Sequence, residues 1–208
     1  MISREKIEYF KKRLESVWNA YLEFDEKITQ IINDADKAIC NSVNNQIRKQ
    51  YFKYYKTIDI DYRNILYGSM LFAFCSLAEY IVKELAKEIV PDYENRIRKK
   101  NGNWLIKNLN LIKEEGKMDV DENDVEFLSY YIKIRNCITH NGGLVSDSNT
   151  ELRTAIAKIQ EYAKKGNYLL LEVAGDGHLI LGDNLVGEVY IKIVGILDRI
   201  LATVNSVE

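Results

Sequence analysis

Apolar residues recur in steps of three and four over the first 35 residues, and this period constrains the fold more than any other feature. The series consists of Ile7, Phe10, Leu14, Val17, Tyr21, Phe24, Ile28, Ile31 and Ala35. Such spacing places the side chains on one stripe of an α-helix, which can pack against another helix. It predicts a long N-terminal helix over 3–36 with Ser3 as its N-cap. The stripe packs either inside a helical bundle of one chain or against a second copy of the chain.

Helices are expected to dominate the rest of the chain, because Pro91 is the only proline among 208 residues. The residue before a proline is pushed out of the helical conformation, so a second helix is predicted over 62–90. The other predicted helices cover 104–115, 121–139, 149–165 and 184–204. Two apolar runs flank the turn signal Asp176-Gly177, which predicts a β-hairpin over 168–182. We therefore expect one mainly α-helical domain over 1–208, with a small hairpin before its C-terminal helix.

Composition narrows the class of protein. Apolar residues make up 47% and charged residues 29%, as in ordinary globular domains, and the net charge of -2 gives no global attraction to nucleic acid. Three cysteines do not form a disulfide framework, and they favour a reducing, cytoplasmic location. The most apolar stretch, 65–82, contains Gly68, Ser69, Ser76 and Glu79. It is therefore expected to be a buried core helix, and no membrane contact is predicted.

The acidic run at 119–124 does not match a calcium-binding loop. Counted from Asp119, the sixth position is Asp124 where glycine is needed, and the twelfth is Tyr130 where glutamate is needed. These acids are better explained as the favourable first turn of the helix that follows. No metal ion and no cofactor is expected.

One segment concentrates the chemistry of the chain: Arg135, Asn136 and His140 lie within six residues at the end of a predicted helix. A helix turns by about 100° per residue, so Asn136 and His140 project about 40° apart, and Arg135 and His140 about 140° apart. Arginine can bind a phosphate with two hydrogen bonds, and histidine can transfer protons near neutral pH. The segment can thus grip and cleave a phosphodiester. A basic helix end that complements the helix dipole is the simpler interpretation.

One chain supplies only half of the proton-transfer groups that RNA cleavage requires. Attack by the RNA's own 2′-hydroxyl needs a base, an acid for the leaving 5′-oxygen, and positive charge for the transition state. Because the cluster holds one histidine, a two-fold dimer that joins two copies would complete the site. Glu79 is expected to pair with Arg135, to polarise His140, or to form a salt bridge at the helix edge. Ser76, one turn earlier, would line the same pocket.

The segment Arg135-Asn136-Cys137-Ile138-Thr139-His140 is similar to the signature of the HEPN superfamily, an arginine followed by four to six residues and a histidine, often beginning Arg-Asn. Asn141-Gly142-Gly143 resembles the Asn-x-Gly tail of several subgroups, and Leu77-Ala78-Glu79-Tyr80 lies in a run that looks like the family's first core helix. The resemblance covers 62–145.

This resemblance implies an all-α, HEPN-like bundle whose motif lies at a helix end. It further implies a homodimer with a composite active site and metal-independent endoribonuclease activity, with Arg135, Asn136 and His140 as the catalytic residues. HEPN proteins are frequent among toxins and antiphage effectors. An antitoxin or another regulatory protein would then be a partner, in addition to the RNA substrate.

A second basic segment suggests where RNA would bind. Arg48, Lys49, Lys53 and Lys56 alternate with aromatic rings, which suits a single-stranded nucleic acid, although solvated lysines on an amphipathic helix are the alternative. A noncatalytic HEPN-like RNA-binding or protein-interaction module is the second functional hypothesis, and a structural dimer held by the apolar stripe is the third. His178 is expected to be a surface or packing residue.

Overall fold

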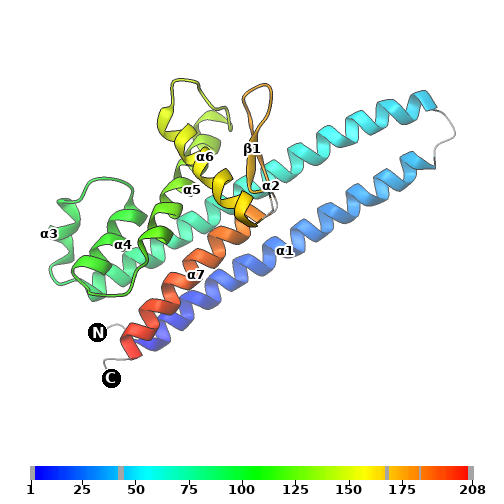
Figure 1. The fold of residues 1–208 in the computed structure, drawn as a ribbon. Helices are drawn as coiled ribbons and strands as arrows, with labels where there is room; N and C mark the ends of the chain where they lie inside the picture. Colours follow the sequence, from blue (N-terminus) through cyan, green and yellow to red (C-terminus); the bar gives the residue numbers. More distant parts are fainter. Residues whose placement is uncertain (1–2, 42–44, 167–168, 183, 206–208) are drawn as a thin grey trace.

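Two long antiparallel helices form the backbone of the fold. The computed structural model describes 3–41, 45–166, 169–182 and 184–205, and the side chains at 45, 47, 51, 52 and 54–59 are outside this description. Helices α1 (Arg4–Cys40) and α2 (Asn45–Ile89) lie side by side along most of their length (Figure 1). Ser3 is the N-cap of α1, as predicted, because its hydroxyl accepts a hydrogen bond from the amide of Lys6.

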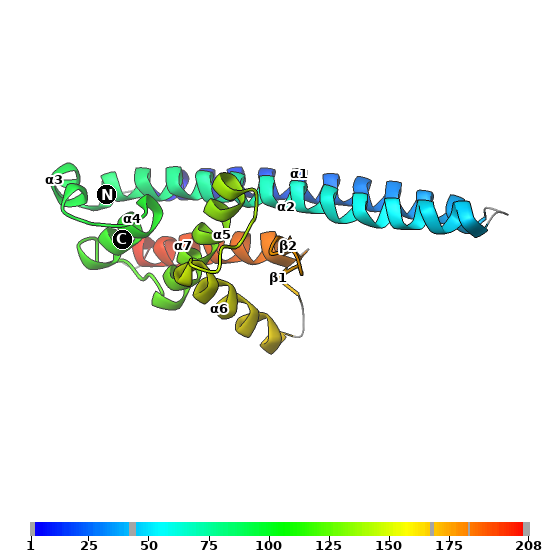
Figure 2. The same cartoon turned by 90° about the horizontal axis from the view of Figure 1, so that it is seen from above.

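Helix α2 begins at Asn45, so the predicted start near Tyr62 is wrong. Between these two positions the sequence has no proline or glycine, and no residue there forces the helix to stop. The C-terminal end agrees with the prediction, because α2 ends at Ile89 shortly before Pro91. The far ends of α1 and α2 project together beyond the other helices, and we call this part (26–40 and 45–62) the arm (Figure 2).

The apolar stripe of α1 packs inside the chain over its first half. Phe10 is 2% exposed, and Ile7, Leu14 and Tyr21 are also buried. In the second half Phe24 and Ile31 are 56% and 68% exposed, so packing inside one chain does not cover the stripe there, and packing against a second copy stays a prediction. Among the described elements, α2 lies beside the second half of α1, whereas α7 also packs on the first half, so less of the helix surface is covered in the second half (Figure 1).

A polar cluster joins α1 to α2 at the base of the arm. Asp25 lies on the side of α1 that faces α2, and its Oδ1 accepts hydrogen bonds from Arg63 Nη1 at 3.2 Å and from the Tyr67 hydroxyl at 3.0 Å. Arg63 Nη2 also donates to the Thr29 hydroxyl at 3.1 Å. Burial raises the pKa of Tyr67 above its usual value, so the phenol stays protonated and keeps donating.

Five shorter helices in the described part of the chain pack on α1 and α2 at the end opposite the arm. They are α3 (Tyr93–Arg98), α4 (Trp104–Glu114), α5 (Glu122–Asn141), α6 (Thr150–Gly166) and α7 (Asn184–Asn205). Helix α7 packs against both α1 and α2, and Asp124 in the first turn of α5 forms ion pairs with Lys192 and Arg199 of α7. Gly142, in the left-handed conformation with a φ of 58°, ends α5. The predicted helices after Pro91 are therefore present, and the fold is mainly α-helical.

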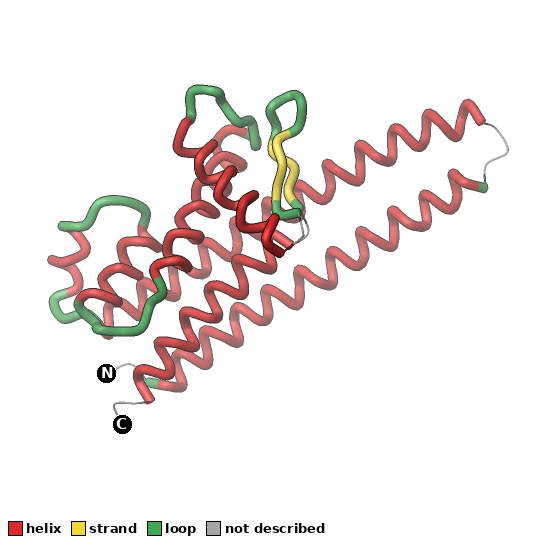
Figure 3. Tube along the Cα trace, viewed as in Figure 1, coloured by secondary structure: helices red, strands yellow, loops and turns green. Residues whose placement is uncertain are grey.

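A two-stranded hairpin precedes α7, as predicted. Strand β1 (Leu171–Val173) pairs antiparallel with β2 (Leu179–Leu181) (Figure 3), and the predicted first residue, 168, is outside the described residues. Asn64 of α2 covers the outer edge of β2, because its side chain donates to the Leu179 carbonyl at 3.2 Å and accepts from the Leu181 amide at 2.8 Å. The Leu179 amide donates to the Gly143 carbonyl at 3.0 Å. The hairpin is thus bonded to the segment that follows His140.

By length and composition alone, the stretch Ile60–Ile89 of α2 qualifies as a membrane span. In this fold α1, α4, α5 and α7 pack around α2, and Leu71, Phe74, Ile81 and Leu85 are fully buried. This packing fits the predicted core helix. The absence of membrane contact stays a prediction.

Candidate functional site

The C-terminal half of α5 carries the Arg135–His140 motif and crosses α2 at close range. The two helices approach at Gly68 of α2, where an added Cβ would lie 3.2 Å from the side chain of Ile138. A larger residue at this position would require the Ile138 side chain to shift by a few tenths of an ångström. The small residue therefore lets the motif side of α5 reach the polar positions of α2.

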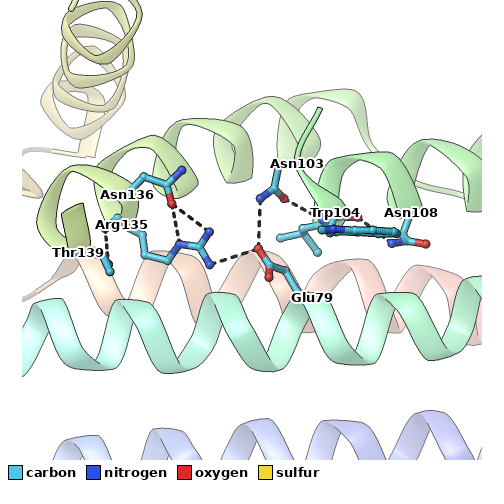
Figure 4. Close-up of polar contacts among 8 residues, drawn as sticks. Glu79, Asn103, Trp104, Asn108, Arg135, Asn136 and Thr139 are labelled. Atoms are coloured by element: carbon cyan, nitrogen blue, oxygen red, sulfur yellow. Dashed lines mark hydrogen bonds and ion pairs between the residues drawn. The ribbon is translucent and has the colours of Figure 1, made fainter. Parts of the chain in front are cut away.

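Arg135 is held in a partly buried polar network. Its side chain is 13% exposed, and its Nη1 lies 3.2 Å from Glu79 Oε1 of α2. Its Nε and Nη2 donate to Asn136 Oδ1 at 3.2 and 3.0 Å. Glu79 Oε1 also accepts a hydrogen bond from Asn103 Nδ2 at 3.2 Å (Figure 4). The expected pairing of Glu79 with Arg135 is thus present, and the contacts of Glu79 do not include His140.

This network fixes the guanidinium and still leaves it able to bind an anion. Three of its five N–H groups donate to Glu79 and Asn136, and the other two have no partner among the described contacts. The guanidinium also lies 6.0 Å from the ring centre of Phe72. Because these contacts hold the side chain in place before a ligand arrives, binding a phosphate would cost little rotamer entropy.

His140 lies outside this network. Helix α5 continues through Asn141, so His140 lies within the last turn of the helix. The exposed His140 side chain lines a hollow of about 230 Å³ between α5 and the start of α6, together with Lys133, Asn136, Asn149 and Glu151. Arg135 and His140 are thus apart, since Arg135 does not line this hollow. Asn136 connects them, because it contacts Arg135 and lines the hollow.

Cys137 is a buried thiol with a structural contact. Its Sγ donates to the Leu144 carbonyl at 3.4 Å, and burial raises its pKa, so the reactive thiolate is disfavoured at neutral pH. The neighbouring His140 makes no contact with this sulfur among the described interactions. This geometry does not support thiol chemistry at the motif.

A larger groove opens beside the motif. Its volume is about 1100 Å³, and it lies between α2, the end of α5 and the hairpin. Ile65, Phe72 and Ile138 supply apolar lining, whereas Asp176 and His178 supply polar lining. The predicted surface position of His178 is confirmed, because its side chain is half exposed. No local sequence pattern indicates that the second histidine lies near the tail of the motif, because only the folded hairpin brings it there.

No family model, curated protein or solved structure matches this chain. The resemblance to HEPN proteins therefore depends on the motif and on the run that surrounds Glu79. In the part of the chain that the structure describes, no group of three or more His, Cys, Asp and Glu side chains converges as metal ligands would.

The remaining predicted site residues lie elsewhere. Ser76 is partly buried on α2 and is not among the residues that line the two hollows described above. Arg48, Lys49 and Lys53 are exposed on the arm, and Lys56 has its side chain outside the described residues. Arg48 is about 45 Å from Glu79 along α2, at a rise of 1.5 Å per residue. The structure does not bring this basic segment to the motif.

Proposed function

We propose that this chain is a HEPN-type endoribonuclease that cleaves RNA by attack of the 2′-hydroxyl, without a metal ion, as a toxin or antiphage effector. The observation that carries the proposal is the fixed guanidinium of Arg135, with two N–H groups that have no partner among the described contacts, on the same helix end as an exposed His140. A cytoplasmic location and control by an antitoxin or regulatory protein belong to the same proposal.

The proposed reaction uses a dimer. Arg135 binds the scissile phosphate and stabilises the negative charge that develops on it. His140 removes the proton of the 2′-hydroxyl, and that oxygen attacks the phosphorus. His140 of the partner subunit donates a proton to the departing 5′-oxygen. The products are a 2′,3′-cyclic phosphate and a free 5′-hydroxyl. Asn136 positions Arg135 relative to the hollow that contains His140.

His140→Ala tests this function directly. In EDTA, the parent protein is expected to cleave single-stranded RNA to 2′,3′-cyclic phosphate ends, and the variant is expected to lose about 10²- to 10⁴-fold in rate. The unfolding midpoint in urea should be the same for both, because the side chain is exposed. Undiminished cleavage by His140→Ala would reject the assignment.

His178→Ala is the companion variant, since it removes the other histidine of the chain. We expect its cleavage rate to stay within about twofold of the parent, as for most surface substitutions. A loss as large as that of His140→Ala would place both proton-transfer groups in one chain, and the dimer would then be unnecessary.

A noncatalytic RNA-binding or protein-interaction module is the second candidate. The observation that favours it is the separation of Arg135 from His140, together with the carboxylate of Glu79 already bound to the arginine. Such a module would retain RNA with no cleavage by the parent protein.

A further inference from the structure

An exposed tryptophan lies directly beside the Arg135 network. Trp104 follows Asn103, the residue that donates to Glu79, and it is 52% exposed. Figure 4 shows Arg135, Glu79 and Trp104 in a row along α2, with Trp104 on the side of Glu79 away from Arg135. Asn103 fixes the start of α4, because its Oδ1 also accepts the Leu105 amide at 2.8 Å. The indole is thus presented from a well-anchored helix end.

Two lysines flank this ring. Lys83 Nζ lies 5.9 Å and Lys107 Nζ 5.1 Å from the ring centre of Trp104. Neither ammonium group forms an ion pair with a carboxylate among the described contacts. The nearest acids along α2 are engaged, because Glu79 binds Arg135 and Glu84 binds Lys87. The two lysines therefore add positive charge to the face around Trp104, and Glu84 acts on Lys83 only at longer range.

The same face of α2 continues to a second ring. Phe72, Glu79 and Lys83 follow one another at helical spacing, and Phe72 is 49% exposed beneath the guanidinium of Arg135. From Phe72 to Lys83 the helix rises about 16 Å. We call Phe72, Arg135, Lys83, Trp104 and Lys107 the α2–α4 track. Each ring of the track has a cation beside it, Arg135 at Phe72 and the two lysines at Trp104, and Glu79 lies between Arg135 and Trp104.

Exposed rings with cations beside them suit one class of ligand. Every nucleobase has a face that can stack on an aromatic ring, and the phosphates between bases pair with ammonium and guanidinium groups. An apolar protein partner would meet a positive charge beside each exposed ring of the track. A flexible, polyanionic strand with stacking faces is the better chemical complement.

We infer that the α2–α4 track binds single-stranded RNA, with a base stacked on Trp104 next to the phosphate that Arg135 holds. The role of that phosphate rests on the proposed function, whereas the stacking on Trp104 does not. The RNA-binding surface then lies on the face that contains the motif, and not on the basic segment of the arm.

Binding is measured apart from cleavage. His140→Ala is the background for all variants, and fluorescence anisotropy in EDTA follows a labelled RNA of about 12 nucleotides, within the range of known single-strand sites. Trp104→Ala is expected to weaken binding about tenfold or more, and Trp104→Phe to retain most of the affinity, because it keeps a stacking face. Lys107→Gln should weaken binding and reduce its salt dependence.

Arg48→Gln with Lys49→Gln is the matched control on the arm, and it should leave the affinity unchanged. A duplex of the same sequence should bind without dependence on Trp104, because its bases are already stacked. Intrinsic fluorescence gives a second readout: RNA should quench the exposed Trp104 and spare Trp18, which is packed on Tyr190 with ring centres 5.0 Å apart.

Unchanged affinity in Trp104→Ala, or no RNA binding at all, would overturn the inference even if the parent protein cleaves RNA. Quenching of Trp104 on raising the protein concentration without RNA would assign the face to a second copy of the chain, and would also overturn it. Binding that depends on Trp104, with no cleavage by the parent, would leave the inference standing and reject the proposed function.

Discussion

Asn136 determines how the two ends of the motif are related. Its side-chain oxygen accepts two hydrogen bonds from Arg135, and the same residue lines the hollow that contains His140. The angular spacing on a helix correctly predicted that Arg135 and His140 diverge. The same spacing predicted that Asn136 projects closer in direction to His140 than Arg135 does. The partner of the arginine on α2 could be anticipated, because Glu79 is a carboxylate in an apolar run.

Asn103 and Trp104 could not be predicted in the same way. They precede and open a short helix, and the sequence contains no period that relates this turn to Glu79. Their place beside the motif follows from the packing of α4 on α2. Contacts between a loop and a distant helix are set by the whole fold, so local patterns do not reveal them.

Cysteine labelling tests the burial next to the motif. Cys40 is exposed, whereas Cys75 and Cys137 are buried, and burial raises the pKa of Cys75 to about 12 and also raises that of Cys137. A raised pKa means less thiolate at pH 8, so we expect one cysteine to react rapidly with iodoacetamide and two only after unfolding. Mass spectrometry of the labelled peptides gives the result. Rapid labelling of Cys137 would contradict this arrangement of α5.

At the level of helices, stop signals were more informative than apolar patterns. Pro91 and Gly142 marked the ends of α2 and α5 because proline and left-handed glycine act through local stereochemistry. The start of α2 had no such signal. In the second half of α1, helical spacing alone does not tell whether the side that contains Phe24 or the side that contains Asp25 faces α2. The structure shows that the Asp25 side faces α2, since Asp25 binds Arg63.

Phe10 and Phe24 form a matched pair for testing α1. They are the same residue type on one helix, with exposures of 2% and 56%. Phe10→Ala is expected to lower the free energy of unfolding by about 3–5 kcal/mol, and Phe24→Ala by less than about 1 kcal/mol. Urea denaturation followed by circular dichroism measures both. A large effect of Phe24→Ala that grows with protein concentration would indicate that a second copy covers this side of α1.

At the level of the whole molecule, the proposed function requires two copies of the motif. One chain contributes one exposed histidine from the motif, and Arg135 is held within its own chain by Glu79. The sequence indicates a half-site because the motif contains one histidine. It could not show that Arg135 would lie against Glu79 while His140 lines a hollow at α6, because that depends on how α2 and α6 pack against α5.

Subunit mixing tests the composite site. When wild-type protein is mixed with His140→Ala and the subunits exchange, dimers with two intact motifs should fall with the square of the wild-type fraction. At equal amounts the rate per total dimer would be about one quarter of the wild-type value under random pairing. Mixing with Ile191→Ala, altered at an exposed position on α7, should leave the rate unchanged. A linear decline to about one half would show that each chain acts alone.

Two helices joined only by an apolar stripe can slide past each other by a heptad, because each step exchanges one set of apolar contacts for a similar set. The cluster of Asp25, Arg63 and Tyr67 removes this freedom. Sliding would leave the charges of Asp25 and Arg63 partly buried and unpaired, which is strongly unfavourable. A single register of α1 on α2 follows. It sets the axial position of Glu79 from a point about 24 Å away along the same helix.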